Sequence, residues 1–214
     1  SVSTSALGHI ETLELQTLVR KGARELTFAR FEQPADVDVI GLELGGDLLR
    51  IGTQARPALF DLNIRRPDLL YETVFEVPGR LDAEGEEVRP LDEATVFRAL
   101  AAARDAGIKA VAVALMHGHV NPAPEARVGQ MAREAGFTQV SLSHQVSRLA
   151  KLVPRGDTTV VDAYLSPILR RYVAQVEGAL DMGRATGRLL FMQSNGGLTE
   201  AGRFQGKDAI LSGP

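Results

Sequence analysis

The chain has 214 residues, of which 44% are hydrophobic and 24% charged, close to the averages for soluble globular proteins. It contains no cysteine, which excludes a disulfide scaffold, a zinc–thiolate site, an iron–sulfur cluster and a cysteine nucleophile. The net charge of −3 argues against a basic surface for nucleic acid, and the apolar runs are too short to span a bilayer. We therefore expect a soluble cytoplasmic protein with neither nucleic-acid nor membrane partners.

The first third of the chain has the weakest pattern. The short apolar run at residues 37–42 predicts a strand. Residues 56–68 contain two prolines and are expected to form a loop that carries Arg56, Arg65 and Arg66. Guanidinium groups of this kind can clamp a carboxylate or a phosphate. A solvated loop with a nearby aspartate as partner is the simpler interpretation.

The middle of the chain alternates between two periodicities. Residues 73–77 predict a strand, residues 92–105 a helix, and the apolar run at 109–116 a strand that is covered on both faces. Asn121-Pro122 opens a second helix that ends at Gly136, and a further strand is predicted at 139–143. This alternation predicts an α/β domain with a mixed or mostly parallel sheet and covering helices.

The longest helical pattern covers residues 157–182. Pro167 lies inside it and is expected to kink the helix or to split it at Ser166. Asp157 and Asp162 near its start are best explained as capping and dipole-stabilising residues, with substrate contact as the alternative. Three shorter elements are expected after this helix: a strand over 188–192, a short helix over 198–204 and a final strand over 208–211.

The turn Ser194-Asn195-Gly196-Gly197 is the first candidate site. It follows a predicted strand and precedes a predicted helix. Two glycines at such a position allow a close approach of the backbone to a ligand, and amides at a helix start can hold an anion. Asn-Gly is also a common pair in a tight turn that binds nothing. The residues alone leave both interpretations open.

Two histidines follow the predicted buried strand. His117 and His119 are two residues apart and would point the same way in extended backbone. They could serve as a metal arm or a catalytic pair, because ligands of α/β proteins bind at the carboxyl ends of strands. No carboxylate at the right spacing completes a metal site, although Glu125 is near in sequence. Hydrogen bonding within a loop is the simpler interpretation, and we expect no metal.

Familiar nucleotide-binding motifs are missing from the sequence. There is no G-x-G-x-x-G, and residues 202–208 place Asp208 where a phosphate loop needs Ser or Thr after Lys207.

Six blocks occur in the order and spacing of one known family. They are "RPALFDLNIRRP", "VFEVPGRLDAEGEEVRPLDE", "VAVALMHGHVNP", "TTVVDAYLSPILRRY", "FMQSNGGL" and "ILSGP". Together they resemble the hydantoinase A/5-oxoprolinase family. The resemblance extends from about Gly46 to Pro214, whereas the first 45 residues match poorly. It divides the chain into an N-terminal segment, 1–45, and the central part of a hydantoinase A-like domain, 46–214.

The resemblance implies an ATP-dependent hydrolase of cyclic amides such as 5-oxoproline or hydantoins. It implies ATP and Mg²⁺ as cofactors of the whole protein, a hydantoinase B-type subunit or domain as partner, and a fold of the actin-like ATPase type. By position it makes Asn195, Gly196 and Gly197 the best binding candidates, with Ser194 beside them, followed by His117 and Arg56. Ser212 and Gly213 would begin the segment that leads to a phosphate loop. It assigns no catalytic residue.

The sequence also departs from the family pattern. Two Gly- and Thr-rich phosphate loops, one upstream and one downstream of the matched part, do not occur in these residues. Pro124 replaces a common histidine, and Pro154-Arg155-Gly156 is an unusual approach to the Thr-Thr pair. We therefore expect a fragment of a longer enzyme that binds no cofactor and is inactive alone. The alternatives are a non-catalytic partner-binding module and a subunit of a related acetone- or acetophenone-type carboxylase.

Overall fold

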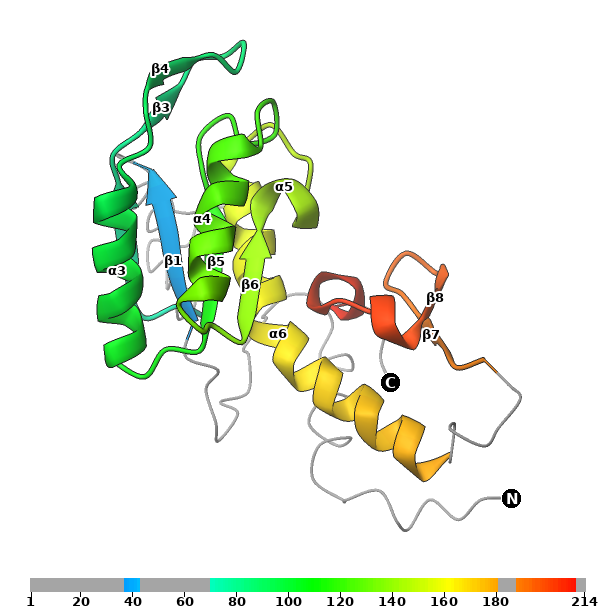
Figure 1. The fold of residues 1–214 in the computed structure, drawn as a ribbon. Helices are drawn as coiled ribbons and strands as arrows, with labels where there is room; N and C mark the ends of the chain where they lie inside the picture. The colour runs from blue at the N-terminus through cyan, green and yellow to red at the C-terminus, as the bar shows by residue number, and fades with distance from the viewer. Residues whose placement is uncertain (1–36, 43–69, 181–187, 211–214) are drawn as a thin grey trace, which may run out of the picture.

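A four-stranded parallel sheet forms the centre of the computed structural model, which describes residues 37–42, 70–180 and 188–210. Its strands follow the order β2-β1-β5-β6. Their bounds are Val37–Leu42 for β1, Val74–Val77 for β2, Ala110–Ala114 for β5 and Gln139–Leu142 for β6. All three pairs of neighbours are parallel, so the predicted α/β class with a mostly parallel sheet is confirmed (Figure 1).

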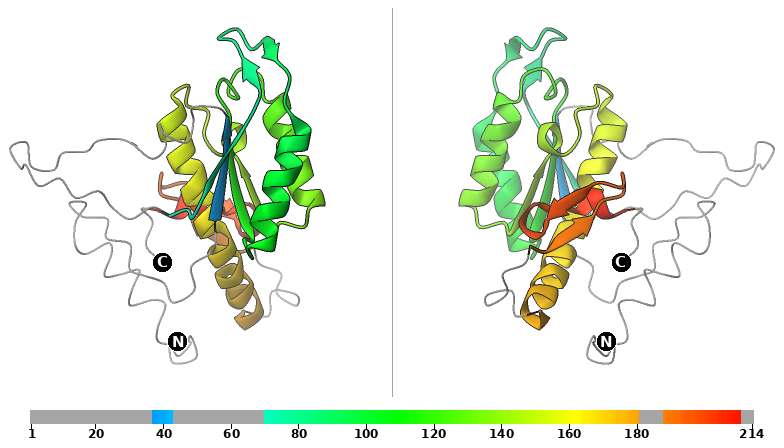
Figure 2. Two further views of the ribbon diagram at one scale, coloured as in Figure 1. Left: turned by 90° about the vertical axis from the view of Figure 1, so that its left-hand side faces the viewer. Right: turned by 90° about the vertical axis from the view of Figure 1, so that its right-hand side faces the viewer.

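Helices cover both faces of the sheet. Helices α3, Glu93–Asp105, and α4, Ala123–Glu134, lie on one face, and the long helix α6, Leu152–Ala179, lies on the other (Figure 2). A short helix, α5, Ser143–Val146, follows β6 directly. The strands and helices from residue 73 to 143 therefore match the sequence pattern to within a few residues.

The alternation of side-chain size in β5 explains how the layers fit. Its sequence is Ala-Val-Ala-Val-Ala, and every residue is buried. Val111 and Val113 pack into the cluster formed with α3 and α4, whereas Ala110 and Ala112 pack against α6. Because alanine is small, α6 can approach the sheet closely on that side.

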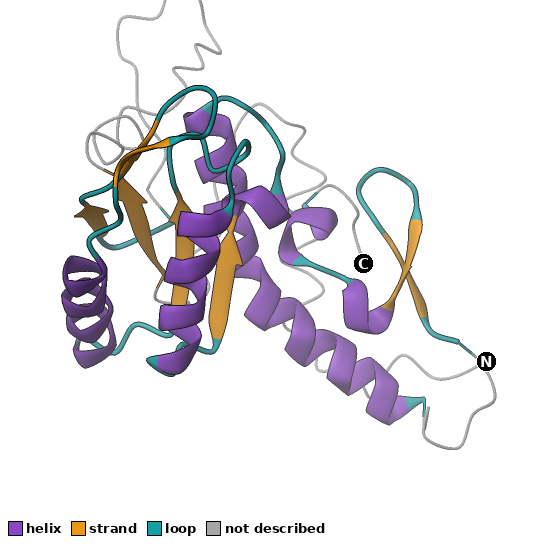
Figure 3. Cartoon of the chain, turned by 45° about the horizontal axis from the view of Figure 1, so that its top comes forward, coloured by secondary structure: helices purple, strands orange, loops and turns teal. Residues whose placement is uncertain are grey.

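Two antiparallel hairpins flank this core. Strand β3, Arg80–Leu81, pairs with β4, Glu87–Arg89, at the carboxyl edge of the sheet. Strand β7, Leu190–Met192, pairs with β8, Leu198–Glu200, beside α6 (Figure 3). Tyr172 on α6 packs edge-on against Phe191, with ring centroids 6.3 Å apart, which holds the second hairpin to the helix.

Four sequence-based expectations are wrong in this region: the start of the long helix, its split at Ser166, the helix at 198–204 and the strand at 208–211. Helix α6 begins at Leu152, five residues earlier than 157, and it continues through Pro167 without splitting. The early start is possible because first-turn amides have no intrahelical acceptor, so Pro154 removes no hydrogen bond there. The expected helix at 198–204 is instead β8 followed by a 3₁₀ turn, η2, Ala201–Arg203, because cross-strand pairing to β7 outweighs the weak helical pattern. The expected strand at 208–211 is replaced by a second 3₁₀ turn, η3, Gly206–Ala209.

In the part of the chain that the structure describes, no helix is both long enough and apolar enough to cross a bilayer.

Candidate functional site

The turn that the sequence singled out first closes the β7–β8 hairpin. The Gln193 amide donates to the Gly197 carbonyl at 2.7 Å, and the Gly197 amide donates to Asn195 Oδ1 at 2.7 Å. Gly196 has a φ of +82°, which favours glycine. Strand β8 follows this turn, so the turn has no helix start beside it, and its geometry is that of a tight turn. A binding role for these residues in a longer protein stays a prediction.

The neighbouring serine has a structural contact. Ser194 donates to the Asp208 carbonyl from both its amide, at 2.6 Å, and its hydroxyl, at 2.7 Å. These bonds tie the hairpin turn to η3. Three other predicted site residues, Arg56, Ser212 and Gly213, lie outside the described residues, as do Arg65 and Arg66.

His117 and His119 lie in a turn after β5 rather than in extended backbone. His117 has a left-handed φ of +59°, and its carbonyl accepts hydrogen bonds from the amides of Val120 and Asn121 at 2.9 and 3.1 Å. The two rings have centroids 6.2 Å apart. Among the described residues, no group of three or more His, Asp or Glu side chains could hold a metal ion.

The main polar cluster of the structure lies directly beneath this turn, and its first member is Glu125. This side chain is fully buried at the start of α4. Its Oε2 accepts from the Leu115 amide at 3.1 Å and from the Ser143 hydroxyl at 2.9 Å. Its Oε1 accepts from the His144 amide at 2.9 Å and lies 2.8 Å from His144 Nδ1. Four contacts thus satisfy a carboxylate that would otherwise be costly to bury.

Arg155 is the second member, and it is also fully buried. Its Nη2 donates to the Leu115 carbonyl at 2.5 Å, and its Nε donates to Ser143 Oγ at 2.9 Å. Its Nη1 lies 3.2 Å from His119 Nδ1 and also donates to the carbonyls of Leu149 and Ala150, at 2.9 and 3.2 Å. The guanidinium therefore joins the end of β5, the turn after it and the approach to α6.

The electrostatic environment of Arg155 includes the negative charge of Glu125 and the ring of His119. Burial lowers the pKa of Arg155, and the negative charge of Glu125 opposes that shift. Arginine has so high an ordinary pKa that it stays cationic in proteins. Burial, followed by the charges of Arg155 and His117, lowers the pKa of His119 below its ordinary value of 6.5. His119 is therefore neutral at pH 7.

Gly118 is required by the close approach of the turn to Glu125. A Cβ atom at this position would lie 2.6 Å from Glu125 Oε2 and 3.2 Å from the Leu115 carbonyl oxygen. The carboxylate is fixed by four contacts, so it cannot move away without losing some of them.

A second polar cluster attaches η3 to α6. Asp162 accepts from the Ser141 hydroxyl at 2.7 Å, from the Ser166 hydroxyl at 3.1 Å and from the Lys207 amide at 3.2 Å. Ser166 in turn accepts from the Gly206 amide at 2.9 Å. The Lys207 ammonium donates to the Val146 carbonyl at 2.8 Å. Gly206 and Lys207 thus attach η3 to α6, and three donors satisfy the Asp162 carboxylate.

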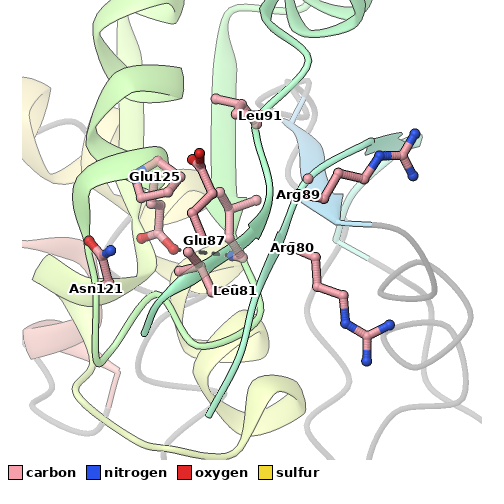
Figure 4. A pocket seen from close by; sticks show the side chains of 10 residues that line it. Arg80, Leu81, Glu87, Arg89, Leu91, Asn121 and Glu125 are labelled. Atoms are coloured by element: carbon pink, nitrogen blue, oxygen red, sulfur yellow. Dashed lines mark hydrogen bonds between the residues drawn. The ribbon is translucent and has the colours of Figure 1, made fainter. Parts of the chain in front are cut away.

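Two hollows lie near these clusters. A small pocket of about 10 Å³ between the β3–β4 hairpin and Glu125 has room for about one water molecule. Figure 4 shows Arg80 and Arg89 extending to the same side, away from Glu125. A groove of about 720 Å³ lies between β6, the second half of α6 and residues 201–205. Its size falls in the range of small-molecule sites.

Two family models match this chain. Residues 5–136 match the family model described as the hydantoinase/oxoprolinase N-terminal region, and residues 155–214 match the hydantoinase/oxoprolinase model. The chain belongs to the hydantoinase/oxoprolinase family. The match begins at residue 5, well upstream of Gly46, where the resemblance of the sequence blocks begins.

Several relatives are enzymes of known name. The chain is 38% identical to 5-oxoprolinase 1 of Arabidopsis thaliana over 92% of its own length and 17% of that protein's. It is 38% identical to the 5-oxoprolinase of Saccharomyces cerevisiae, covering 78% of this chain and 15% of that one. The chain thus spans less than a fifth of the length of these relatives.

Solved structures of the same fold also exist. The ATP-dependent caprolactamase of Pseudomonas jessenii superposes with a TM-score of 0.77 at 29% identity, over 95% of this chain and 29% of that one. A nucleotide-free acetone carboxylase superposes with a TM-score of 0.72 at 21% identity, over 94% of this chain and 28% of that one. At that identity, the likeness to the carboxylase shows the fold alone.

The sequence interpretation named none of Arg155, Ser143 and Glu125 as a site residue. It mentioned Arg155 as part of a departure from the family pattern and Glu125 as a carboxylate near the histidines. The sequence of α6 does contain a pattern that could have identified Arg155. Its buried polar residues recur at a helical spacing of four, three and four: Arg155, Thr159, Asp162 and Ser166. Polar residues on the apolar stripe of a helix indicate a buried hydrogen-bond network.

Proposed function

We propose that this chain is a section of an ATP-dependent cyclic amide hydrolase of the hydantoinase/5-oxoprolinase type. The observation that carries the proposal is the pair of family matches, in order, over residues 5–136 and 155–214. The 29% identity and TM-score of 0.77 to an ATP-dependent caprolactamase support it, because the name of that enzyme includes both the nucleotide and a lactam substrate. We place the protein in the cytoplasm.

We propose that the described residues do not form a nucleotide site by themselves. In the hairpin turn, the Gly197 amide is already bonded to Asn195 Oδ1, and the Lys207 ammonium is bonded to the Val146 carbonyl. The Gly197 amide and the Lys207 ammonium are thus engaged within the chain, whereas a phosphate loop needs such groups to face the phosphate. We propose that ATP and Mg²⁺ are held by other parts of the longer protein, within a fold of the actin-like ATPase type, and that the present chain alone is inactive.

The chemistry explains why such an enzyme needs ATP. An amide carbonyl is a poor electrophile, and transfer of a phosphoryl group to its oxygen makes the ring carbon open to attack. The present chain would supply a rigid α/β section that positions the turn 194–197 and the histidine loop within the whole enzyme. The turn residues Ser194 to Gly197, with His117 and Arg56, remain our candidates for contact with substrate or nucleotide.

A partner subunit forms part of this proposal. One relative, 35% identical over 64% of this chain, is named caprolactamase subunit alpha, so that enzyme has at least one other kind of subunit. We propose a hydantoinase B-type subunit or domain as the corresponding partner here.

A non-catalytic module is the second candidate. It is favoured by one observation, the engagement of Gly197 and Lys207 in structural hydrogen bonds. Steady-state ATP hydrolysis by the full-length gene product, with and without 5-oxoproline, hydantoin or caprolactam, separates the two. Stimulation by a cyclic amide supports the enzyme, and the absence of any ATP turnover supports the module. A carboxylase subunit would instead consume ATP in the presence of a ketone and bicarbonate.

A further inference from the structure

The β7–β8 hairpin has two faces of different character. Exposed and partly buried residues alternate along both strands, as they do when only one face of a hairpin is packed. Phe191 lies on the packed face, where it contacts Tyr172 edge-on and stacks on Phe204 with ring centroids 5.1 Å apart. These aromatic contacts hold the packed face of the hairpin to the described fold, and the opposite face is exposed.

Three large apolar side chains form this exposed outer face. Leu190 is 43% exposed, Met192 61% and Leu198 63%. Met192 is the direct cross-strand partner of Leu198, and Leu190 lies two positions before Met192 on the same face. A single exposed apolar side chain is ordinary, but monomeric soluble proteins rarely expose several of them side by side. The outer face therefore has the character of an interaction surface.

The outer face is also bordered and fixed in the way that an interface requires. Glu200 is the cross-strand partner of Leu190 and forms an ion pair with Arg188, so charged groups border the apolar side chains. At the other end of the hairpin, Ser194 donates two hydrogen bonds to the Asp208 carbonyl. A partner would thus meet a surface that is already formed, which lowers the entropic cost of association.

The rest of a longer polypeptide is the occupant that the comparisons and the fold favour. The chain covers 29% of the caprolactamase chain and 17% of 5-oxoprolinase 1, so most of each relative lies outside the matched part. The described residues end at Ile210, two positions after Asp208, and the polypeptide therefore leaves the described fold beside the hairpin turn. A segment tethered this closely would reach the outer face at a high effective concentration.

We propose that the outer face, Leu190, Met192 and Leu198, is an intramolecular docking surface that another part of the same longer polypeptide covers with apolar side chains. The hairpin would join this α/β section to the rest of the protein. This assignment rests on the proposed function only in taking the chain as a section of a longer protein. It does not depend on ATP or on cyclic amide chemistry.

The experiment is the oxidation of Met192 in the full-length protein without its partner subunit. Hydrogen peroxide converts an accessible methionine to its sulfoxide, and mass spectrometry of the digested protein gives the rate at Met192. We expect oxidation to be at least about 10-fold slower in the native protein than in the urea-unfolded protein, at low and at high protein concentration. A native rate close to the unfolded rate overturns the proposal. Protection that requires the partner subunit, or a high protein concentration, also overturns it and assigns the face to that subunit or to a second copy.

Two matched variants provide a second measurement. L198K places an ammonium group beside Met192, and V88K places one on the β3–β4 hairpin, where Val88 is also 63% exposed. We expect L198K to raise the oxidation rate of Met192 by about 3- to 10-fold, because burial of an unpaired charge opposes docking. V88K should leave that rate unchanged. Equal rates in L198K, V88K and wild type overturn the proposal, and the wild-type rate decides it if L198K fails to fold.

ATP hydrolysis separates this docking surface from the proposed function. Stimulation of hydrolysis by a cyclic amide, with Met192 unprotected, would refute the docking surface and leave the proposed function standing. Protection of Met192 in a protein without such stimulation would do the reverse.

Discussion

Glu125 and Arg155 are fully buried, come from opposite faces of the sheet and meet on a single hydroxyl group. Ser143 donates to the carboxylate at 2.9 Å and accepts from the guanidinium at 2.9 Å. The Leu115 backbone makes a second link, because its amide donates to Glu125 and its carbonyl accepts from Arg155. The cluster thus locks α4, α6 and the ends of β5 and β6 together, directly below the histidine turn.

Replacing Arg155 should destabilise the protein strongly. R155M leaves Glu125 buried without its compensating charge and leaves the Leu115 carbonyl without its donor. We expect a loss of about 3–5 kcal/mol in the free energy of unfolding, measured by urea denaturation. R104M removes an arginine from an exposed ion pair with Asp105 and should change stability by less than about 1 kcal/mol. A loss no larger than that of R104M would show that the cluster contributes little.

Two glycine substitutions should have opposite signs. G118A places a methyl group 2.6 Å from Glu125 Oε2, and should cost about 1–3 kcal/mol. G178A lies in α6 with nothing within 4 Å of the added Cβ, and should stabilise the protein by about 0.5–1 kcal/mol through helix propensity. Thermal unfolding of both variants checks this pair. A neutral G118A would contradict the packing around Glu125.

Stability should fall as the pH is lowered below about 6.5. The pKa of His119 is lowered in the folded state, so the folded protein favours the neutral ring more than the unfolded chain does. The resulting stability is present above the unfolded pKa of 6.5 and is lost as the pH falls through the lowered folded value. Protonation would also turn the acceptor for Arg155 into a donor. Urea denaturation between pH 7.5 and 5 should show this slope in wild type, and H119N should reduce it. An equal slope in both proteins would assign the effect to other groups.

The hairpin turn should depend on Gly196. Its φ of +82° is unfavourable for residues with a Cβ, so G196A should destabilise the hairpin by about 1 kcal/mol. Hydrogen exchange at the amides of β7 and β8 should rise, while exchange at β5 stays unchanged. G202A is the control, because the added Cβ meets nothing within 4 Å and its φ is not left-handed. Unchanged exchange in G196A would refute the role of this turn in closing the hairpin.

The sequence predicted the sheet better than the site. The apolar run of β5 and the helix α4 are local patterns, and the structure contains both, although the N-cap position of α4 is Pro122 rather than Asn121. The polar cluster is not a local pattern, since Glu125, Ser143 and Arg155 come from three separate elements. Each polar residue considered alone is expected at the surface. Only their contacts in the folded chain explain why they are buried.

The second strand of the β7–β8 hairpin was also not predictable from local sequence. The segment 198–204 is too short for its periodicity to distinguish a strand from a short helix. Pairing of Phe191 with Thr199 and of Met192 with Leu198 decides for the strand. With β8 in place of a helix, the turn at Gly196 has no helix start beside it, and its geometry is that of a tight turn.

The most direct test of the proposed function is the rate of ATP hydrolysis by the full-length protein, with its partner subunit, in the presence and absence of 5-oxoproline, hydantoin and caprolactam. We predict that at least one cyclic amide stimulates hydrolysis and is itself opened in proportion to the ATP consumed. ATP hydrolysis that none of the three compounds changes, with every ring recovered intact, would contradict the account.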